Sequence, residues 1–389
     1  MAAGSEERER EQRWRALSEQ LLREPELAFH EQRAHDLICA ELTREGFAVQ
    51  RNYVFSTGFR AEYKQPPEPA PVDGVAVALV CEYDALPGLG HACGHNLVAA
   101  GTLAAASAIR RCMEKERVNG RLVVLGVPGS EAARPRCKSR LLDEGALTGL
   151  TALLALHPTS PRDPSLCPAI EQESVAGQWL DVRFHGPASV DAAVLLYWIL
   201  ASRCRGVVSR GGSNPCEPTT LAESQYVLVA PDDATLCERR QMAEDALLGV
   251  AKATGCFFEC RFGKPRPRPV FNRVLEQLYS EQVLKTGVAP SWFSCSSGQW
   301  YGAWSDWGRV SRALPCLRAT YIVPGALGPP HSRAFAEVVA SPPALNATFE
   351  AAEALAATAL KVLEQRDDSL VSQHLLQQAR IHVPPTRAH

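Results

Sequence analysis

The sequence has no long hydrophobic run and little excess of charge of either sign. None of its apolar stretches is long enough to cross a bilayer, so we expect no membrane-spanning helix. The first residues, Met1 to Glu11, are charged and lack the apolar segment that a signal peptide needs. The formal net charge of −2 gives no reason to expect a nucleic acid or an acidic membrane as a partner.

A regular cysteine spacing is also absent. The chain has 13 cysteines, an odd number, scattered without a repeating interval. Without a secretion signal, this pattern favours reduced thiols over a disulfide framework, so we expect a cytoplasmic protein. The length of 389 residues suggests two domains, and the hydrophobic content of 46% is ordinary for a globular protein.

The segment from Val75 to Val98 carries the clearest signals in the chain. It opens with an unbroken apolar run, Val75 to Cys81, which predicts a strand buried on both faces in a parallel sheet. Polar side chains suited to a metal or a substrate follow directly: Glu82, Asp84, His91, Cys93, His95 and Asn96. Cys93-Gly94-His95 places a thiolate and an imidazole two residues apart. Alone this is a weak signal, since most buried cysteines are small apolar filler.

Two further buried strands end in side chains of the same kind. Leu122 to Val127 is followed by Glu131, and the apolar run from Leu150 to Leu156 ends at His157. Parallel strands separated by helices bring their carboxyl ends to one edge of the sheet. Coincidence explains any one of these residues, but it does not easily explain three strand ends with ligand-type residues. The pattern therefore predicts a metal site at this edge.

Apolar periodicity predicts the remaining elements of this part of the chain. Helices are expected over residues 12–49 with a break near Pro25, and over 97–113, 141–150, 270–285 and 345–364, with a proline-rich loop over 66–73. Residues 314–323 lead to a loop that contains His331. His30 and His35 are five residues apart, which is the wrong spacing for two zinc ligands on one helical face. We therefore expect both to be surface histidines.

A second domain is predicted from about Gln178 onward. Strand and helix patterns alternate there as strands over 179–184, 226–229 and 257–262 with helices over 191–203 and 236–254. The predicted boundaries are 12–175 and 269–366 for the first domain and 176–268 for an inserted α+β domain, with Lys264 to Pro269 as a linker back.

The central segment carries a family resemblance. Glu82-Tyr-Asp-Ala-Leu-Pro-Gly88 followed by Gly90-His-Ala-Cys-Gly-His-Asn96 resembles the M20 family of metallopeptidases and amidohydrolases, and within it the branch of Xaa-Arg and β-alanyl-lysine dipeptidases. Asn96 fits this branch, because other branches usually have Asp there. The resemblance covers nearly the whole chain, including Ser305-Asp306-Trp307-Gly308 and the Ala-rich last helix.

The resemblance implies a fold and a set of roles. The fold is α/β, a metal-dependent exopeptidase-type catalytic domain with an inserted lid that also serves as a dimerisation surface, which makes the chain a homodimer. The family's metal ligands map onto Cys93, His95, Glu131, His157 and His331. They would hold two divalent ions, zinc or else manganese or cobalt. Asp84 falls where the family has an acid that orients a ligand, and Asp306 is a candidate substrate contact.

Three departures from the family pattern concern catalysis. The family's general base is the first of two adjacent glutamates, but here the pair reads Ser130-Glu131. A serine hydroxyl is no base at neutral pH, and losing a positioned base typically costs about a hundred- to ten-thousand-fold in rate. The family's lid histidine is missing after Gly186-Pro-Ala-Ser189, and Val229 and Cys216 stand where the family has an arginine and an asparagine.

Two functions follow from this reading. The first is metal-dependent hydrolysis of the amide bond of small dipeptides that end in a basic residue. The alternative is a catalytically impaired relative that keeps the fold and the metal site and acts by binding. A structural protein with incidental cysteines would leave the five ligand-type residues unexplained.

Overall fold

The computed structural model describes residues 2–65, 74–131, 137–160, 175–201, 204–214, 216–217, 219–285 and 306–364. The proline-rich loop predicted over 66–73 lies outside these residues. The described chain divides into two compact units. The first takes its residues from 1–172, 270–301 and 310–389, and the second from 173–269 and 302–309.

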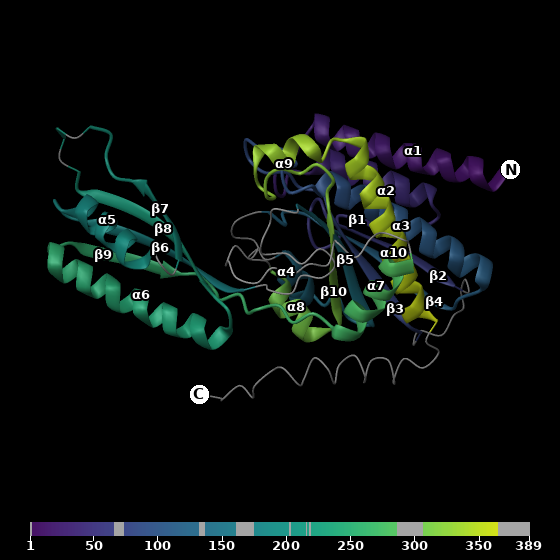
Figure 1. The fold of residues 1–389 in the computed structure, drawn as a ribbon. Helices are drawn as coiled ribbons and strands as arrows, with labels where there is room; N and C mark the ends of the chain where they lie inside the picture. The colour runs from purple at the N-terminus through teal and green to yellow at the C-terminus, as the bar shows by residue number, and fades with distance from the viewer. Residues whose placement is uncertain are drawn as a thin grey trace. The chain divides into compact units, whose positions relative to one another are not determined.

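The first unit is built on a six-stranded sheet (Figure 1). Its strands, in spatial order, are β1 (Ala48–Arg51), β2 (Phe59–Gln65), β4 (Gly120–Val127), β3 (Ala76–Glu82), β5 (Ala152–Thr159) and β10 (Cys316–Ile322). The strands β4, β3, β5 and β10 are mutually parallel, whereas β1 and β2 join the sheet antiparallel at the β4 edge. Every residue of β3 and β5 is buried, as expected for central strands covered on both faces.

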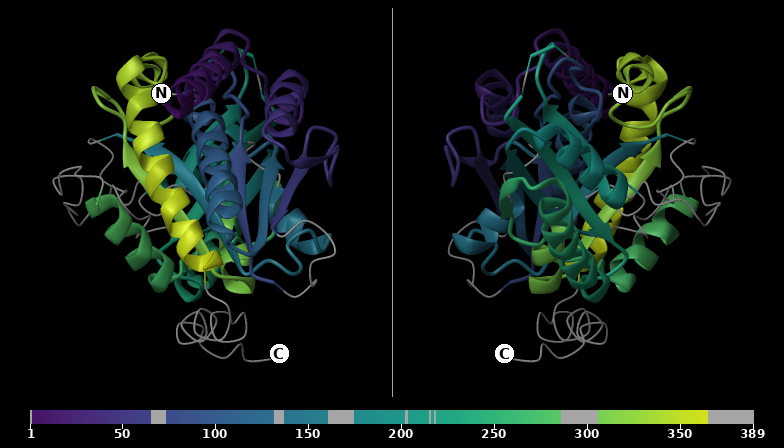
Figure 2. Two further views of the ribbon diagram at one scale, coloured as in Figure 1. Left: turned by 90° about the vertical axis from the view of Figure 1, so that its right-hand side faces the viewer. Right: turned by 90° about the vertical axis from the view of Figure 1, so that its left-hand side faces the viewer.

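Helices cover the faces of this sheet. α3 (His95–Glu116) and α10 (Pro342–Leu363) run side by side across one face, where Figure 2 shows them in front of the strands. The other helices that lie wholly in this unit are α1 (Ala2–Arg23), α2 (Gln32–Arg44), α4 (Cys137–Asp143), α7 (Arg273–Lys285) and α9 (Arg333–Val338). α8 (Trp307–Ala313) spans the boundary between the two units.

The second unit is an antiparallel sheet with two helices. Its strands follow the order β7 (Cys204–Arg210), β8 (Leu221–Ala230), β6 (Ala176–His185) and β9 (Phe257–Phe262). α5 (Ser189–Leu200) and α6 (Asp233–Thr254) pack against each other and against the sheet. Apolar side chains from both helices and from the sheet form a separate core.

Several predicted elements differ from the structure. The helix expected over 141–150 is wrong, because α4 spans Cys137–Asp143 and the chain then turns through Gly145 and Gly149, both with positive φ. The strands β1, β2 and β7 were not expected.

Among the described residues, no helix is long and apolar enough to cross a membrane.

The surface location predicted for His35 is also wrong. His30 is exposed, but His35 is completely buried. It lies on the inward stripe of α2 with Ala34, Ile38 and Leu42, at the spacing that points one helical face at the core. Its ring packs against Phe59, so the residue belongs to the core.

Candidate metal centre

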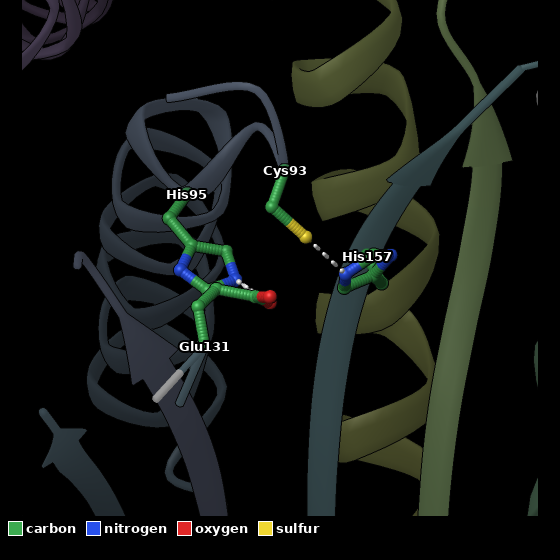
Figure 3. Close-up of side chains that lie close together, drawn as sticks. All are labelled: Cys93, His95, Glu131 and His157. Atoms are coloured by element: carbon green, nitrogen blue, oxygen red, sulfur yellow. Dashed lines mark hydrogen bonds and ion pairs between the residues drawn. The ribbon is translucent and has the colours of Figure 1, made fainter. Parts of the chain in front are cut away.

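The proposed ligands come from four connections at one edge of the first unit's sheet. Cys93 and His95 lie where the chain leaves β3 and enters α3, and Gly94 between them adopts a left-handed conformation with φ of 77°. Glu131 follows β4, His157 lies within β5, and His331 precedes α9. Figure 3 shows the side chains of Cys93, His95, Glu131 and His157 converging on a common centre.

The donor atoms of these side chains lie close together. One ligand atom from each of Cys93, His95, Glu131 and His157 falls within 4.8 Å of all the others. The Cys93 Sγ lies 3.4 Å from His157 Nε2, and His95 Nε2 lies 3.4 Å from Glu131 Oε1. His331 Nε2 joins the same group, at 3.3 Å from Cys93 Sγ and 2.9 Å from Glu131 Oε2.

This geometry fits a bound divalent ion. Ligand atoms on a common tetrahedral zinc are about 3.3 to 3.8 Å apart, given zinc–ligand bonds of about 2.0 to 2.3 Å. The separations of 3.4 Å fall within this range. Among the described residues, the buried His95 Nε2 has no hydrogen-bond partner, and its contact with Glu131 in Figure 3 is an ion pair of 3.4 Å. A polar atom is rarely buried without a partner, and a metal ion would supply one.

Asp84 forms hydrogen bonds with two of these ligand residues. Its Oδ1 accepts a hydrogen bond of 2.8 Å from His95 Nδ1, which leaves His95 Nε2 free to face the centre. Its Oδ2 accepts a hydrogen bond of 2.8 Å from the backbone N–H of Glu131. One carboxylate thus sets the ring orientation of His95 and the backbone position of Glu131, as expected for an acid that orients ligands.

Ser130 is part of a hydrogen-bonded triangle beside the centre. Its hydroxyl donates to the carboxylate of Glu82 and accepts a hydrogen bond of 3.0 Å from the Lys138 ammonium group. Lys138 Nζ also forms an ion pair of 2.6 Å with Glu82, and both side chains are only 3% exposed. The second oxygen of Glu82 lies 3.8 Å from His95 Nε2. A buried carboxylate therefore lies next to the position that carries the base in the family.

Charges in the site shift several pKa values. Burial opposes ionisation of the Glu131 carboxyl, but the hydrogen bond from His331 and the charges of His95 and His331 lower its pKa below the usual range. The electrostatic interaction with Cys93 is the largest cause that raises the pKa of His331 to about 11. Burial also opposes ionisation of Glu82, but the charges of Lys138, His95 and Arg318 and the hydrogen bond from Lys138 together lower the pKa of that carboxyl. Both carboxylates are thus held in the charged form.

Other predicted site residues fall elsewhere. Asp306 is buried and belongs to the second unit, and its contact with substrate stays a prediction. Val229 lies in β8 and His185 ends β6, where it faces Glu259 on β9. Sequence reasoning gave Glu82 no specific role and did not find Lys138. Glu82 had a signal, because it directly follows a buried strand, whereas nothing near Lys138 in the sequence marks it.

Comparisons with known proteins agree with this architecture. The chain is 32% identical over 384 residues to the Xaa-Arg dipeptidase of Homo sapiens, with 90% of this chain and 85% of that protein covered. It is 26% identical over 318 residues to a component of the p-aminobenzoyl-glutamate hydrolase of Escherichia coli (strain K12), with 73% and 64% covered. No family model matches.

Among solved structures, the fold is similar to that of a dinuclear metal-binding peptidase from Bacillus subtilis, described as a member of the M20 family. The TM-score is 0.69 at 18% sequence identity, and the match covers 92% of this chain and 99% of that one. At this identity the likeness concerns the fold. The predicted α/β fold class is confirmed.

Proposed function

This chain belongs to the M20 family of metallopeptidases, and from that premise we propose that it hydrolyses the amide bond of small dipeptides with a basic C-terminal residue. The observation that carries the proposal is the convergence of thiolate, imidazole and carboxylate donors at one sheet edge. The human relative is named for cleavage before arginine, which supports the substrate class.

We propose Cys93, His95, Glu131, His157 and His331 as the metal ligands. This donor set suits zinc, with manganese or cobalt as alternatives. Five side chains are more than one tetrahedral ion takes, which supports two ions. A divalent ion held there would polarise the substrate carbonyl and lower the pKa of a bound water.

The residues around the ligands have separate tasks in this proposal. Asp84 keeps the proton of His95 on Nδ1, so that Nε2 stays available to the ion. Ser130 occupies the position of the base but takes no proton at neutral pH. We therefore expect slow turnover, limited by proton transfer. Asp306 remains the proposed contact for the substrate.

We also propose that the protein is a cytoplasmic homodimer that associates through α5 of the second unit. Most of the large side chains on the outer face of α5 are apolar and exposed: Val194, Leu195, Tyr197, Trp198 and Ile199. An exposed apolar patch of this kind marks a protein interface, and a second copy of the chain presents the matching patch. The cysteines in the described residues are free thiols, in keeping with a reducing compartment.

A panel of dipeptides tests the substrate class. Protein loaded with zinc or manganese is incubated with β-alanyl dipeptides ending in lysine, arginine or ornithine, and with matched peptides ending in leucine or glutamate. The proposal predicts release of the basic amino acids well above that of leucine and glutamate. Equal release from all peptides would refute the preference for a basic residue.

The alternative of a relative that acts only by binding is not favoured, because the curated relatives are named hydrolases.

A further inference from the structure

Glu31 is a buried carboxylate outside the proposed ligand set. It directly precedes α2 and is completely buried. Its Oε1 accepts hydrogen bonds of 2.8 Å from the backbone N–H groups of Phe29 and Gly129, and its Oε2 accepts one of 2.8 Å from the hydroxyl of Thr57. Among the described residues, it forms no ion pair with a lysine or an arginine. In the part of the chain that the structure describes, hydrogen bonds from Thr57, Phe29, Gly129 and the backbone of Glu31 itself stabilise its charge.

Burying a carboxylate in this way destabilises the fold, so its presence indicates that it has a function. Burial raises the pKa of Glu31, although the hydrogen bonds oppose this effect. Burying an ionised carboxylate without a cation costs free energy that hydrogen bonds only partly repay. An apolar side chain could fill the same space at lower cost but would accept none of these hydrogen bonds. The partners of Glu31 therefore indicate what it does.

Two of these partners are backbone groups in the left-handed region, where only the non-glycine Phe29 is strained, and the two residues touch each other. Phe29 and Gly129 both have positive φ, 65° and 62°, and Phe29 is not a glycine. A Cβ atom on Gly129 would lie 2.5 Å from the Phe29 ring, so the ring packs directly on the glycine. By accepting both N–H groups on one oxygen, Glu31 holds these two segments together although they lie far apart in the sequence.

Gly129 is two residues from the proposed ligand Glu131. Asp84 accepts the N–H of Glu131, and Glu31 accepts the N–H of Gly129. The two carboxylates thus hold alternate N–H groups on either side of Ser130. We infer that Glu31 is a positioning residue, which fixes the 128–131 turn so that the Glu131 carboxylate faces His95 and His331. This role rests on the proposed function, because it assigns Glu131 to the metal.

Two substitutions of Glu31 distinguish the effect of side-chain length from the effect of charge. Glu31→Gln keeps the length of the side chain: its amide oxygen can accept from Phe29 and Gly129, and its NH2 group can donate to the Thr57 hydroxyl. Glu31→Asp keeps the charge but is one methylene shorter, so it cannot reach all three donors. Glu26→Asp is the matched control, because the Glu26 carboxylate also accepts two backbone N–H groups, from Arg33 and Ala34, and contacts none of the proposed ligands.

The measurement is binding of Co²⁺ to metal-free protein, followed by titration calorimetry and by the absorption of the cobalt–thiolate bond. Glu31→Asp should weaken binding by about 10- to 100-fold, the usual effect of losing a partner behind a ligand. Glu31→Gln and Glu26→Asp should bind like the unmodified chain. Circular dichroism verifies that each variant is folded.

The positioning role would be overturned if Glu31→Gln weakened Co²⁺ binding and Glu31→Asp did not. In that case the charge of Glu31, and not its length, would determine the affinity. Unchanged affinity in both variants would overturn it as well. If the unmodified chain binds no Co²⁺, the proposed function fails and the positioning role fails with it, a result distinct from the other two.

Discussion

Ser130, at the proposed base position, lies between a buried ammonium group and a buried carboxylate. The hydroxyl satisfies Lys138 and Glu82 at once. A carboxylate at this position would compete with Glu82 for the same lysine. Ser130 thus forms structural hydrogen bonds but cannot act as a base.

Ser130→Glu should raise kcat. The new carboxylate can accept a proton at neutral pH, and a positioned base contributes about a hundredfold at the low end of its range. Steady-state hydrolysis of β-alanyl-lysine by metal-loaded protein measures the change. Ser130→Ala is the control, because it removes the hydroxyl without adding a base. An equal gain in both variants, or none in Ser130→Glu, would contradict the assignment of Ser130 to the base position.

Lys138→Met should destabilise the metal-free fold by about 3–5 kcal/mol at pH 7, because it leaves Glu82 buried without its main cation. The positive charge of Lys138 lowers the folded-state pKa of Glu82. The stabilisation is therefore complete above the ordinary pKa of 4.5 and is lost as the pH falls through the lower folded-state value.

Urea unfolding of this variant measures the loss, and the double variant Glu82→Gln with Lys138→Met should recover part of it. A double variant with a loss equal to the sum of the two single losses would show that the pair contributes nothing jointly.

At the scale of elements, the buried central strands with apolar runs could be predicted, whereas β1, β2 and β7 could not. The all-apolar runs of β3, β4 and β5 mark central strands, and the residues that follow them meet in space because the strands are parallel. The strands β1 and β7 are short or mostly exposed edge strands, so their side chains show no apolar run. Without an apolar run, nothing in the sequence indicated these two strands.

The candidate site, too, could be predicted only in part from the sequence. Ligand-type residues near or beyond the carboxyl ends of the central strands were found from the sequence. Contacts between distant segments, such as those of Lys138 with Glu82 and of Glu31 with Gly129, depend on the tertiary fold. The family resemblance supplied His331, which no local pattern marks.

Gly94→Ala tests how the turn into α3 presents Cys93 and His95. Gly94 has φ of 77°, and a Cβ atom there would lie 2.5 Å from Cγ of Pro158, the neighbour of His157. We expect the substitution to destabilise the fold by at least about 1–2 kcal/mol, the cost of left-handed backbone for a residue with a Cβ atom. Metal content after purification should fall as well.

The control is Gly249→Ala in α6, where a Cβ atom meets nothing within 4 Å and the helix should become slightly more stable. Thermal unfolding and metal analysis compare the two variants. Full metal content and stability in Gly94→Ala would show that the turn tolerates a side chain.

At the scale of the whole molecule, the two units have separate cores, and the second carries the exposed apolar face of α5. Trp198→Glu should convert the proposed dimer into a monomer. The indole is 73% exposed in the single chain, so the charge harms the interface and not the fold. Light scattering after size exclusion gives the mass. Leu284→Glu on α7, also exposed, is the control. A single-chain mass for the unmodified protein would contradict the dimer.

The most direct test of the central claim is metal-dependent hydrolysis of β-alanyl-lysine by the purified protein. Metal-loaded protein should release lysine slowly, lose this activity on chelation and regain it when zinc or manganese is restored. His95→Ala, which removes a ligand, should remain inactive throughout. Two results together would contradict the account. Folded, metal-loaded protein would release no more lysine from β-alanyl-lysine than His95→Ala does, and it would release no arginine from any Xaa-Arg dipeptide.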